Sequence, residues 1–394
     1  MNDDIVIVSA ARTPFGKLRG GLASLSGVEL GVIAVRAALA RVGLDPAAID
    51  AVVLGQVLQA GAGQNPARQT AAGAGIPLTT PSVAVNSVCL SGARAVIDAA
   101  RMLLAGDADA VIAGGQESMT RAPHLLPGSR LGWAYGSVTA LDHAAHDGLT
   151  DAISQRSMGE ATEADIAVLG LSRVEQDAVA AASHQRAAAA TAGGVLVAEL
   201  VPVTITDRRG DTVIGADEGV RPTTTEKALG ALRPAFAAEG TITAGNASPL
   251  SDGAAAVVVA RASWAREQGL PVLARVAGWA HVAGPDTSLH GQPARAIRRA
   301  VERAGWSIDS LDHLEINEAF AAVAIQSARD LGVDLARVNP HGGAIALGHP
   351  IGASGARLVA HAAHVIAAGG ARRAAVALCG GGGQGDALLL ERVE

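Results

Sequence analysis

The chain has 394 residues, of which 49% are hydrophobic and only 2% aromatic, and its formal net charge is -6 with a pI near 6.0. The length predicts two or three structural units, and 48 glycines in a largely aliphatic composition favour closely packed α/β layers. The negative charge, and the absence of basic runs with interleaved aromatic residues, argue against nucleic acid as a partner.

The N-terminal sequence gives no secretory signal. Residues 1–4 are acidic, and Arg12 and Lys17 interrupt the apolar stretch that follows. No uninterrupted apolar segment approaches the ~18 residues that indicate a membrane span. Because the two cysteines, Cys89 and Cys379, are far apart, a disulfide framework is not expected. We therefore expect a cytoplasmic protein with reduced thiols and no membrane association.

Strands and helices are predicted to alternate along the chain. Short runs rich in Val, Ile and Ala have the length of buried strands, and the longer segments between them have helical periodicity. This alternation is typical of βαβ units with helices on both faces of a sheet. We predict strands at residues 5–8, 51–54, 83–85, 110–113, 255–259 and 374–378, and helices at residues 28–42, 90–104, 293–304 and 353–367.

Part of the sequence is repeated. The eighteen positions that begin at Ser91 match those that begin at Ser354 in ten places, and both runs open with Ser-Gly-Ala-Arg. Asp50 corresponds to Asp312 at nearly the same offset, within a similar helix–turn–strand pattern. The chain is therefore predicted to be duplicated, with two similar α/β halves.

Residues 119–249, the inserted segment, have no counterpart in the second half. Ser172 and Glu175 form a predicted capping box at the start of its longest helix. We predict that the segment is a lid or substrate-binding loop domain. The predicted parts are an N-terminal α/β half at 1–118 and 250–270, an inserted loop domain at 119–249, and a C-terminal α/β half at 271–394.

Cys89 lies in the sequence NSVCLSG, where a predicted strand ends and an Ala-rich helix begins. The free N–H groups and the dipole at a helix N-terminus stabilise negative charge on sulfur. This position predicts a lowered pKa and a reactive thiol. The alternative is a buried cysteine that only fills space.

His349 lies at the matching junction in the second half, in the glycine-rich segment 342–355. If the two halves pack about a pseudo-twofold axis, His349 comes near Cys89. An imidazole is the usual base for a catalytic thiol. A purely structural histidine in a tight turn is the alternative.

Two further segments carry candidate chemistry. Cys379 precedes four glycines, a turn that can present N–H groups to a ligand as an oxyanion hole. No Walker lysine pattern accompanies it, so a phosphate loop is disfavoured. Asn317, in the sequence NEAF, follows a strand-like run and could direct its amide into the same site. His361 and His364 are three residues apart on a predicted helix, but no further ligands are evident, and no metal site is predicted.

Together these elements resemble the thiolase family, and the likeness covers essentially the whole chain. Other segments similar to the family lie at residues 5–14, 61–69 and 240–248. The resemblance implies a duplicated, layered α/β/α/β/α fold with an inserted loop domain. It is strongest to biosynthetic thiolases, the acetyl-CoA C-acetyltransferases, which implies reversible condensation of two acetyl-CoA to acetoacetyl-CoA and CoA.

The resemblance also implies roles for individual residues. Cys89 would be the nucleophile that becomes acylated, His349 would take its proton, and Cys379 would move the α-proton of the second acyl-CoA. His349 and a water held by Asn317 would form one oxyanion hole, and the N–H groups of Cys89 and Gly381 the other. No metal and no tightly bound cofactor are expected, because coenzyme A and acyl-CoA are substrates.

The inserted segment and its surroundings are expected to bind coenzyme A. Ser157 stands where acetoacetyl-CoA thiolases usually carry a histidine, and Pro249 and Ser251 also depart from the family pattern. A 3-ketoacyl-CoA thiolase of fatty-acid breakdown, with a preference for longer chains, therefore stays an alternative, and a non-catalytic acyl-CoA-binding relative a weaker one. The predicted coenzyme A contacts are Leu149, Met158, Arg221, Phe236, Ala244, Ser248, Ala319 and Phe320.

The family resemblance implies a homo-oligomer, either a dimer or a dimer of dimers. Contacts between dimers would involve part of the inserted segment, at about residues 122–142.

Overall fold

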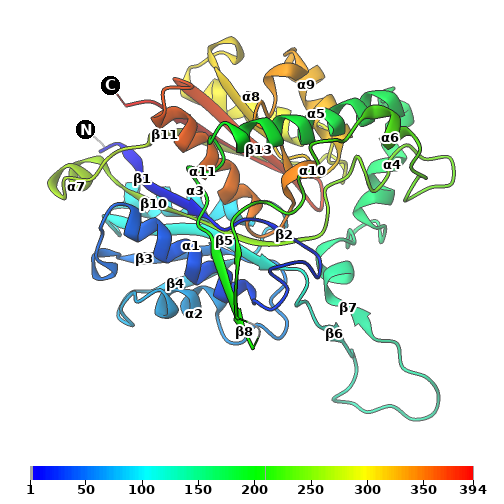
Figure 1. Ribbon diagram of the computed structural model, residues 1–394, viewed down its shortest axis with the longest axis horizontal. Coiled ribbons are helices and arrows are strands. Elements are labelled where there is room, and N and C mark those ends of the chain that lie inside the picture. Colours follow the sequence, from blue (N-terminus) through cyan, green and yellow to red (C-terminus); the bar gives the residue numbers. More distant parts are fainter. Residues whose placement is uncertain (1–2, 209, 394) are drawn as a thin grey trace.

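The computed structural model describes residues 3–208 and 210–393 of the chain (Figure 1). Most of its strands join in one continuous mixed sheet with the order β12-β13-β14-β11-β1-β10-β5-β3-β4, and β2 pairs with β10 beside this path. The N-terminal and C-terminal parts of this sheet form two separate β layers (Figure 1). The N-terminal half contributes β1 (Ile5–Arg12), β2 (Gly16–Lys17), α1 (Gly27–Arg41), η1 (Pro46–Ala48), β3 (Ala51–Gly55), α2 (Pro66–Gly73), β4 (Ser82–Val85), α3 (Ser91–Ala105), β5 (Ala110–Ser118), β10 (Ser251–Arg261) and α7 (Ala262–Glu267).

The C-terminal half repeats this plan. Strands β1 and β11 meet at the centre of the sheet. On the N-terminal side, the pairs β1–β10 and β10–β5 are antiparallel and β5–β3 is parallel. On the C-terminal side, β11–β14 and β14–β13 are antiparallel and β13–β12 is parallel. The next parallel pair, β3 with β4, has its counterpart in a parallel bridge between Leu314 and Val338. The C-terminal half contributes β11 (Ala274–Ala283), α8 (Gln292–Ala304), η3 (Ile308–Ser310), β12 (His313–Ile316), α9 (Ala321–Leu331), η4 (Leu335–Arg337), α10 (Ala344–Leu347), α11 (Ser354–Ala367), β13 (Arg373–Gly380) and β14 (Gln384–Glu391).

The sequence repeat corresponds to repeated hydrogen bonds. A carboxylate oxygen of Asp50 accepts from the backbone N–H groups of Asp109 and Ala110 at the start of β5. The carboxylate of Asp312 accepts from two successive N–H groups at the start of β13 in the same way. The duplication predicted from the sequence is confirmed by this repetition and by the strand order.

Helices α3 and α11 are the middle layer. They pack against each other and against strands of both halves, including β5 and β14 for α3 and β10 and β13 for α11 (Figure 1). The outer face of the N-terminal sheet is covered by α1 and α2, and that of the C-terminal sheet by α8 and α9. The arrangement is therefore α/β/α/β/α, as predicted.

Glycines allow the N-termini of the two middle helices to touch. A Cβ added to Gly92 would lie 2.7 Å from the backbone nitrogen of Ala356, and one added to Gly355 would lie 2.3 Å from that of Ala93. Both distances are too short for a side chain. The close approach sets the two segments that precede α3 and α11 opposite each other.

The inserted segment packs along one side of this body, and the loop between β6 and β7 projects away from it (Figure 1). Buried ion pairs from Arg12 on β1 to Glu199 and Asp217 attach the segment to the sheet. The predicted capping box of Ser172 and Glu175 is confirmed. The segment contains β6 (His124–Leu125), β7 (Leu141–Asp142), η2 (Ala144–Gly148), α4 (Met158–Leu169), α5 (Arg173–Ala192), β8 (Val203–Asp207), β9 (Gly210–Ile214) and α6 (Glu226–Gly230).

A search of residues 3–208 and 210–393 finds no helix with both the length and the apolar character that a membrane crossing requires.

Candidate active site

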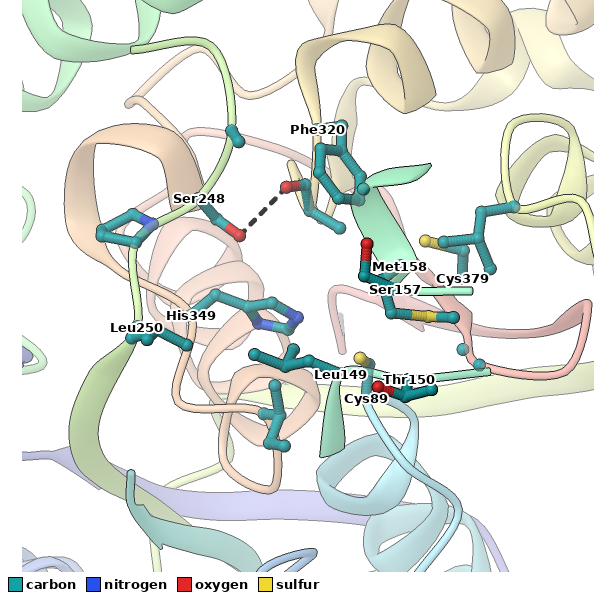
Figure 2. Close-up of a pocket in the computed structure, with 18 of the residues that line it drawn as sticks. Cys89, Leu149, Thr150, Ser157, Met158, Ser248, Leu250, Phe320, His349 and Cys379 are labelled. Carbon is teal, nitrogen blue, oxygen red and sulfur yellow. Dashed lines mark hydrogen bonds between the residues drawn. The ribbon is translucent and has the colours of Figure 1, made fainter. Parts of the chain in front are cut away.

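One largely apolar cavity of about 380 Å³ lies where the two halves meet the inserted segment (Figure 2). The sulfurs of Cys89 and Cys379 and the ring of His349 all border it (Figure 2). Three distant parts of the sequence therefore reach one space. The other residues that line it are Met119, Ala145, Leu149, Thr150, Ser157, Met158, Gly159, Phe236, Ala247, Ser248, Pro249, Leu250, Leu289, Ala319, Phe320, Ile351, Gly380 and Gly381.

Cys89 is held by a strained turn between β4 and α3. Val88 has a φ of 50°, which is unusual for a β-branched residue. Its N–H donates to Oδ1 of Asn86 at 3.0 Å, and its carbonyl accepts from the hydroxyl of Ser91 at 2.6 Å. The N–H groups of Cys89 and Gly381 both point to the Cys89 sulfur. The turn therefore presents the thiol beside two backbone donors.

The expectation of a lowered pKa for Cys89 is wrong. Burial raises the pKa of this thiol to about 12, and the nearby Glu117 carboxylate adds to the increase. The N–H groups of Cys89 and Gly381 act in the opposite direction but are outweighed. Helix α3 begins at Ser91, two residues after the cysteine, and the apolar surroundings outweigh its dipole. Cys89 is therefore a neutral thiol in the substrate-free protein and needs a base within reach.

His349 can be that base. The hydroxyl of Ser354 donates to the carbonyl of Pro350 at 3.0 Å, so it is free to accept from Nδ1–H of His349 at 2.5 Å. This arrangement leaves Nε2 of the neutral ring as an acceptor. Burial, assisted by the positive charge of Arg357, lowers the pKa of His349 to about 4. The ring is therefore neutral near pH 7 and able to accept a proton.

Asn317 lies next to this ring. Its Nδ2 is 3.4 Å from Nε2 of His349, and its buried Oδ1 has no hydrogen-bond partner among the described residues. The backbone N–H of His349 donates to the hydroxyl of Ser251, which donates to the carbonyl of Pro249. Pro249 and Ser251, two of the three positions that depart from the family pattern, therefore support the segment that carries His349.

Cys379 ends β13 just before the glycine turn, and β14 returns antiparallel to it. Gly382 and Gly383 have φ values of 78° and 68°, a conformation that favours glycine. Burial raises the pKa of Cys379, and the negative charge that Cys89 carries as a thiolate raises it further. A base of high pKa suits the removal of a proton from carbon, because an α C–H is a very weak acid.

Glu117 supports the site from behind. Its carboxylate accepts from the N–H groups of Val57, Leu58 and Gly352 at 2.9, 3.2 and 3.0 Å. Burial raises its pKa to about 7, although these hydrogen bonds oppose the shift. One side chain on β5 therefore joins the N-terminal half to the segment between His349 and α11.

Phe320 and Ser248 lie on the side of the cavity above the ring of His349 (Figure 2). The rings of Phe236 and Phe320 meet edge to face, with centroids 6.2 Å apart. Both the N–H and the hydroxyl of Ser248 donate to the carbonyl of Ala319 at 3.0 Å. The hydroxyl of Ser157 caps α4, where it accepts from the N–H of Glu160.

Most of the predicted coenzyme A contacts border the cavity, but two do not. Leu149, Met158, Phe236, Ser248, Ala319 and Phe320 line it, whereas the exposed residues Arg221 and Ala244 lie outside.

Two supporting residues, Ser354 and Glu117, were missed in the sequence. The repeated Ser-Gly-Ala-Arg could have indicated Ser354, because this serine begins the helix that follows His349. No sequence pattern indicated the partners of Glu117.

Comparison with known families and relatives gives a consistent result. Residues 5–263 match the family described as thiolase, N-terminal domain, and residues 270–392 match thiolase, C-terminal domain. A probable acetyl-CoA acetyltransferase of Mycolicibacterium smegmatis is 53% identical over 388 residues, which cover 98% of this chain and 100% of the relative. An acetyl-CoA acetyltransferase of Pseudomonas aeruginosa is 48% identical over 391 residues, 99% of each chain.

Among solved structures, the crystal structure of the Bacillus anthracis acetyl-CoA acetyltransferase matches with a TM-score of 0.97 and 37% sequence identity. The match covers 100% of both chains, so the inserted segment and both halves have counterparts there.

Proposed function

The chain belongs to the thiolase family, and on this premise we propose that it catalyses the reversible condensation of two acetyl-CoA to acetoacetyl-CoA and CoA. The relatives at 53% and 48% identity are named as a probable acetyl-CoA acetyltransferase and an acetyl-CoA acetyltransferase. The observation that carries the proposal is the joint lining of one apolar cavity by Cys89, His349 and Cys379.

In the first half-reaction, the Cys89 sulfur attacks the thioester carbonyl while its proton passes to Nε2 of His349. The tetrahedral intermediate then expels the CoA thiolate, which takes the proton from His349 and leaves as CoA. An acetyl group remains on Cys89. The N–H groups of Cys89 and Gly381 are suited to stabilise the oxyanion, since donors in a dry site cost no reorganisation during reaction.

In the second half-reaction, Cys379 gives its own proton to Nε2 of His349, and as a thiolate it then takes an α-proton from the second acetyl-CoA. The resulting carbanion attacks the acetyl group on Cys89, and the bond from carbon to the Cys89 sulfur breaks. Acetoacetyl-CoA is released, the proton on His349 passes to the Cys89 sulfur, and Cys379 keeps the α-proton as a neutral thiol. With Nε2 protonated in this step, His349 is proposed to donate to the enolate oxygen together with Asn317, whose Nδ2 lies 3.4 Å from Nε2.

Coenzyme A is proposed to run from the cavity over the inserted segment, with no tightly bound cofactor. The apolar contacts would hold its thiol arm, and Ser248 is the polar contact nearest the chemistry. Arg221 and Ala244, outside the cavity, would meet the distal part of coenzyme A.

A 3-ketoacyl-CoA thiolase with longer substrates is the second candidate. It is favoured by Ser157, which places a small residue with an occupied hydroxyl at the cavity wall. The rate of thiolysis as a function of acyl chain length decides between the two. We expect the highest kcat/KM with acetoacetyl-CoA. A strong preference for chains of about eight carbons or more would contradict the acetyl-CoA assignment.

We further propose that the protein acts in the cytoplasm as a homodimer or a dimer of dimers. Leu131 and Tyr135, in the projecting loop between β6 and β7, are almost fully exposed and are suited to contacts between subunits. Light scattering of the purified protein, with the loop intact and shortened, measures the oligomeric state. A monomer would contradict the proposal.

A further inference from the structure

Behind the catalytic elements, three histidines and a glutamate gather in the C-terminal half. One potential ligand nitrogen from each of His313, His341 and His361 lies within 4.8 Å of the other two. Nδ1 of His341 is 3.0 Å from Nε2 of His361. Oε1 of Glu315 is 3.1 Å from Nε2 of His313 and 3.9 Å from Nε2 of His361.

These distances match a metal coordination shell. Ligands that bind one tetrahedral ion at about 2.0–2.1 Å are separated from each other by about 3.3 Å. Three of the six separations among the four donor atoms, between 3.0 and 3.9 Å, fall around this value, and the three histidine nitrogens all lie within 4.8 Å of one another. Side-chain adjustments that close the longer separations would let the four donor atoms bind one ion.

Two of the donor atoms lack hydrogen bonds. Nε2 of His313 and Oε1 of Glu315 are buried, and despite their proximity neither makes a well-aligned hydrogen bond with any described residue. Their side chains are only 4% and 0% exposed. A buried polar group without a partner costs about 1–3 kcal/mol. The two atoms lie 3.1 Å apart and form an ion pair with each other when His313 carries a second proton. A cation bound between them would satisfy both atoms without that proton.

The surrounding residues hold the donors in orientations suited to metal binding. Nδ1 of His361 lies 2.7 Å from Oε2 of Glu199, so its Nε2 faces the cluster. Oε2 of Glu315 accepts from Arg357 at 3.1 Å, so its Oε1 is the free oxygen. Carboxylate and hydrogen-bonding partners of this kind fix the orientation of metal ligands in proteins.

We propose that His313, Glu315, His341 and His361 bind one divalent transition-metal ion. Three imidazoles and a carboxylate, without a thiolate, favour Zn²⁺ and exclude the all-oxygen surroundings that Ca²⁺ and Mg²⁺ require. Four protein ligands make a closed, structural site. This proposal departs from the sequence-based expectation of no metal.

The position of the site indicates what the ion would do. His313 and Glu315 lie two residues apart on β12, hence on one face, and this strand leads directly into Asn317. His361 lies on α11, two turns after Ser354. His341 is in the half-buried loop before α10, which leads to His349. One ion would tie together the three elements that carry these residues, and His341 gives it access from the surface.

Metal binding by the full-length protein tests the proposal without reference to activity. The protein is stripped with a chelator, dialysed, and equilibrated with Zn²⁺ in competition with a metal-binding dye. We expect one tightly bound ion per chain and an increased unfolding temperature. His341→Asn and the double variant H313N/H341N should weaken Zn²⁺ binding by at least about 100-fold, beyond the 10–100-fold effect typical of residues that only orient ligands.

His364→Asn is the matched control. His364 lies on α11 and is half-buried like His341, but it contacts the carbonyl of Ala10 and Arg41 outside the cluster. This variant should keep the wild-type affinity. Co²⁺ bound to the wild type should give the strong visible absorption of a tetrahedral site. Circular dichroism checks that each variant is folded.

Three results would overturn the proposal. The first is wild-type protein that binds Zn²⁺ no more tightly than the folded double variant. The second is a loss of affinity in H364N as large as in H341N, and the third is a Co²⁺ spectrum typical of a hydrated ion.

Discussion

Ser91 begins α3 and Ser354 begins α11, and the two hydroxyls make related hydrogen bonds. Ser91 accepts from the N–H of Ser87 at 2.9 Å and donates to the carbonyl of Val88. Ser354 donates to the carbonyl of Pro350, but the group that it accepts from is the ring of His349. The same helix start therefore supports a backbone turn in one half and an imidazole in the other.

This difference shows how a duplicated fold can supply two unlike groups to one cavity. The close contact of the two helix starts sets Cys89 and His349 opposite each other. Burial then raises the pKa of Cys89 to about 12 and lowers that of His349 to about 4. Both groups are neutral in the substrate-free protein, so the thiol proton must move to the ring as the sulfur attacks.

The largest effect is expected from Cys379→Ser, which separates the two half-reactions. Exchange of the α-protons of acetyl-CoA with D₂O should slow by about 10²–10⁴-fold, the usual contribution of a general acid–base group. Acetylation of Cys89 should continue, because Cys379 takes no part in it. Mass spectrometry and deuterium incorporation measure the two steps. Unimpaired exchange in this variant would contradict the role of Cys379.

An intermediate effect is expected from removing the two equivalent hydroxyls. Ser354→Ala should slow acetylation by about 10-fold, part of the 10²–10⁴-fold that a general base contributes, because Nδ1–H of His349 loses its acceptor. It should also shift the pH dependence of acetylation. Ser91→Ala should leave the pH dependence unchanged, since its hydroxyl contacts only backbone. Pre-steady-state rates of acetylation across pH measure this difference, and identical pH profiles for the two variants would contradict it.

The smallest effect concerns stability at the junction between the halves. The pKa of Glu117 is about 7 in the folded protein, against an ordinary value of 4.5 for a glutamate. Folded protein therefore holds a proton that unfolded protein has lost, and wild-type stability falls as pH rises through this window. Glu117→Gln has no such proton. Between about pH 5 and about pH 8, the free energy of unfolding of wild type should therefore fall by roughly 2–3 kcal/mol relative to that of the variant.

Urea unfolding at the two pH values, at one protein concentration, measures this quantity for Glu117→Gln. If the difference in unfolding free energy between variant and wild type were the same at both pH values, Glu117 would be charged at both. That result would contradict the raised pKa.

Much of the fold was predictable because the repeat is local in the sequence. The Ser-Gly-Ala-Arg repeat and the paired residues Asp50 and Asp312 indicated the duplication, which the strand order confirms. Strand β11 was not predicted, because Arg275 and His281 interrupt its apolar pattern. Their partners, Glu391 and Asp386, lie on the neighbouring strand β14, about a hundred residues later in the sequence. Ion pairs between residues so far apart in the sequence leave no periodic signal.

The candidate site was predictable in its residues but not in its electrostatics. The glycine-rich junctions indicated Cys89 and His349, whereas the pKa of Cys89 depends on apolar walls built from the inserted segment. The histidine cluster was missed for a related reason. His361 was paired with His364 by helical spacing, but the fold places it beside His313 and His341, from other elements.

The most direct test of the proposed chemistry is the site of acetylation after mixing with acetyl-CoA. Mass spectrometry of quenched, digested protein should find one labile acetyl group on the peptide that contains Cys89. The same adduct should form in Cys379→Ser and be absent in Cys89→Ser. An acetyl group on another residue, or no adduct on Cys89 in a protein that still performs thiolysis, would contradict the account.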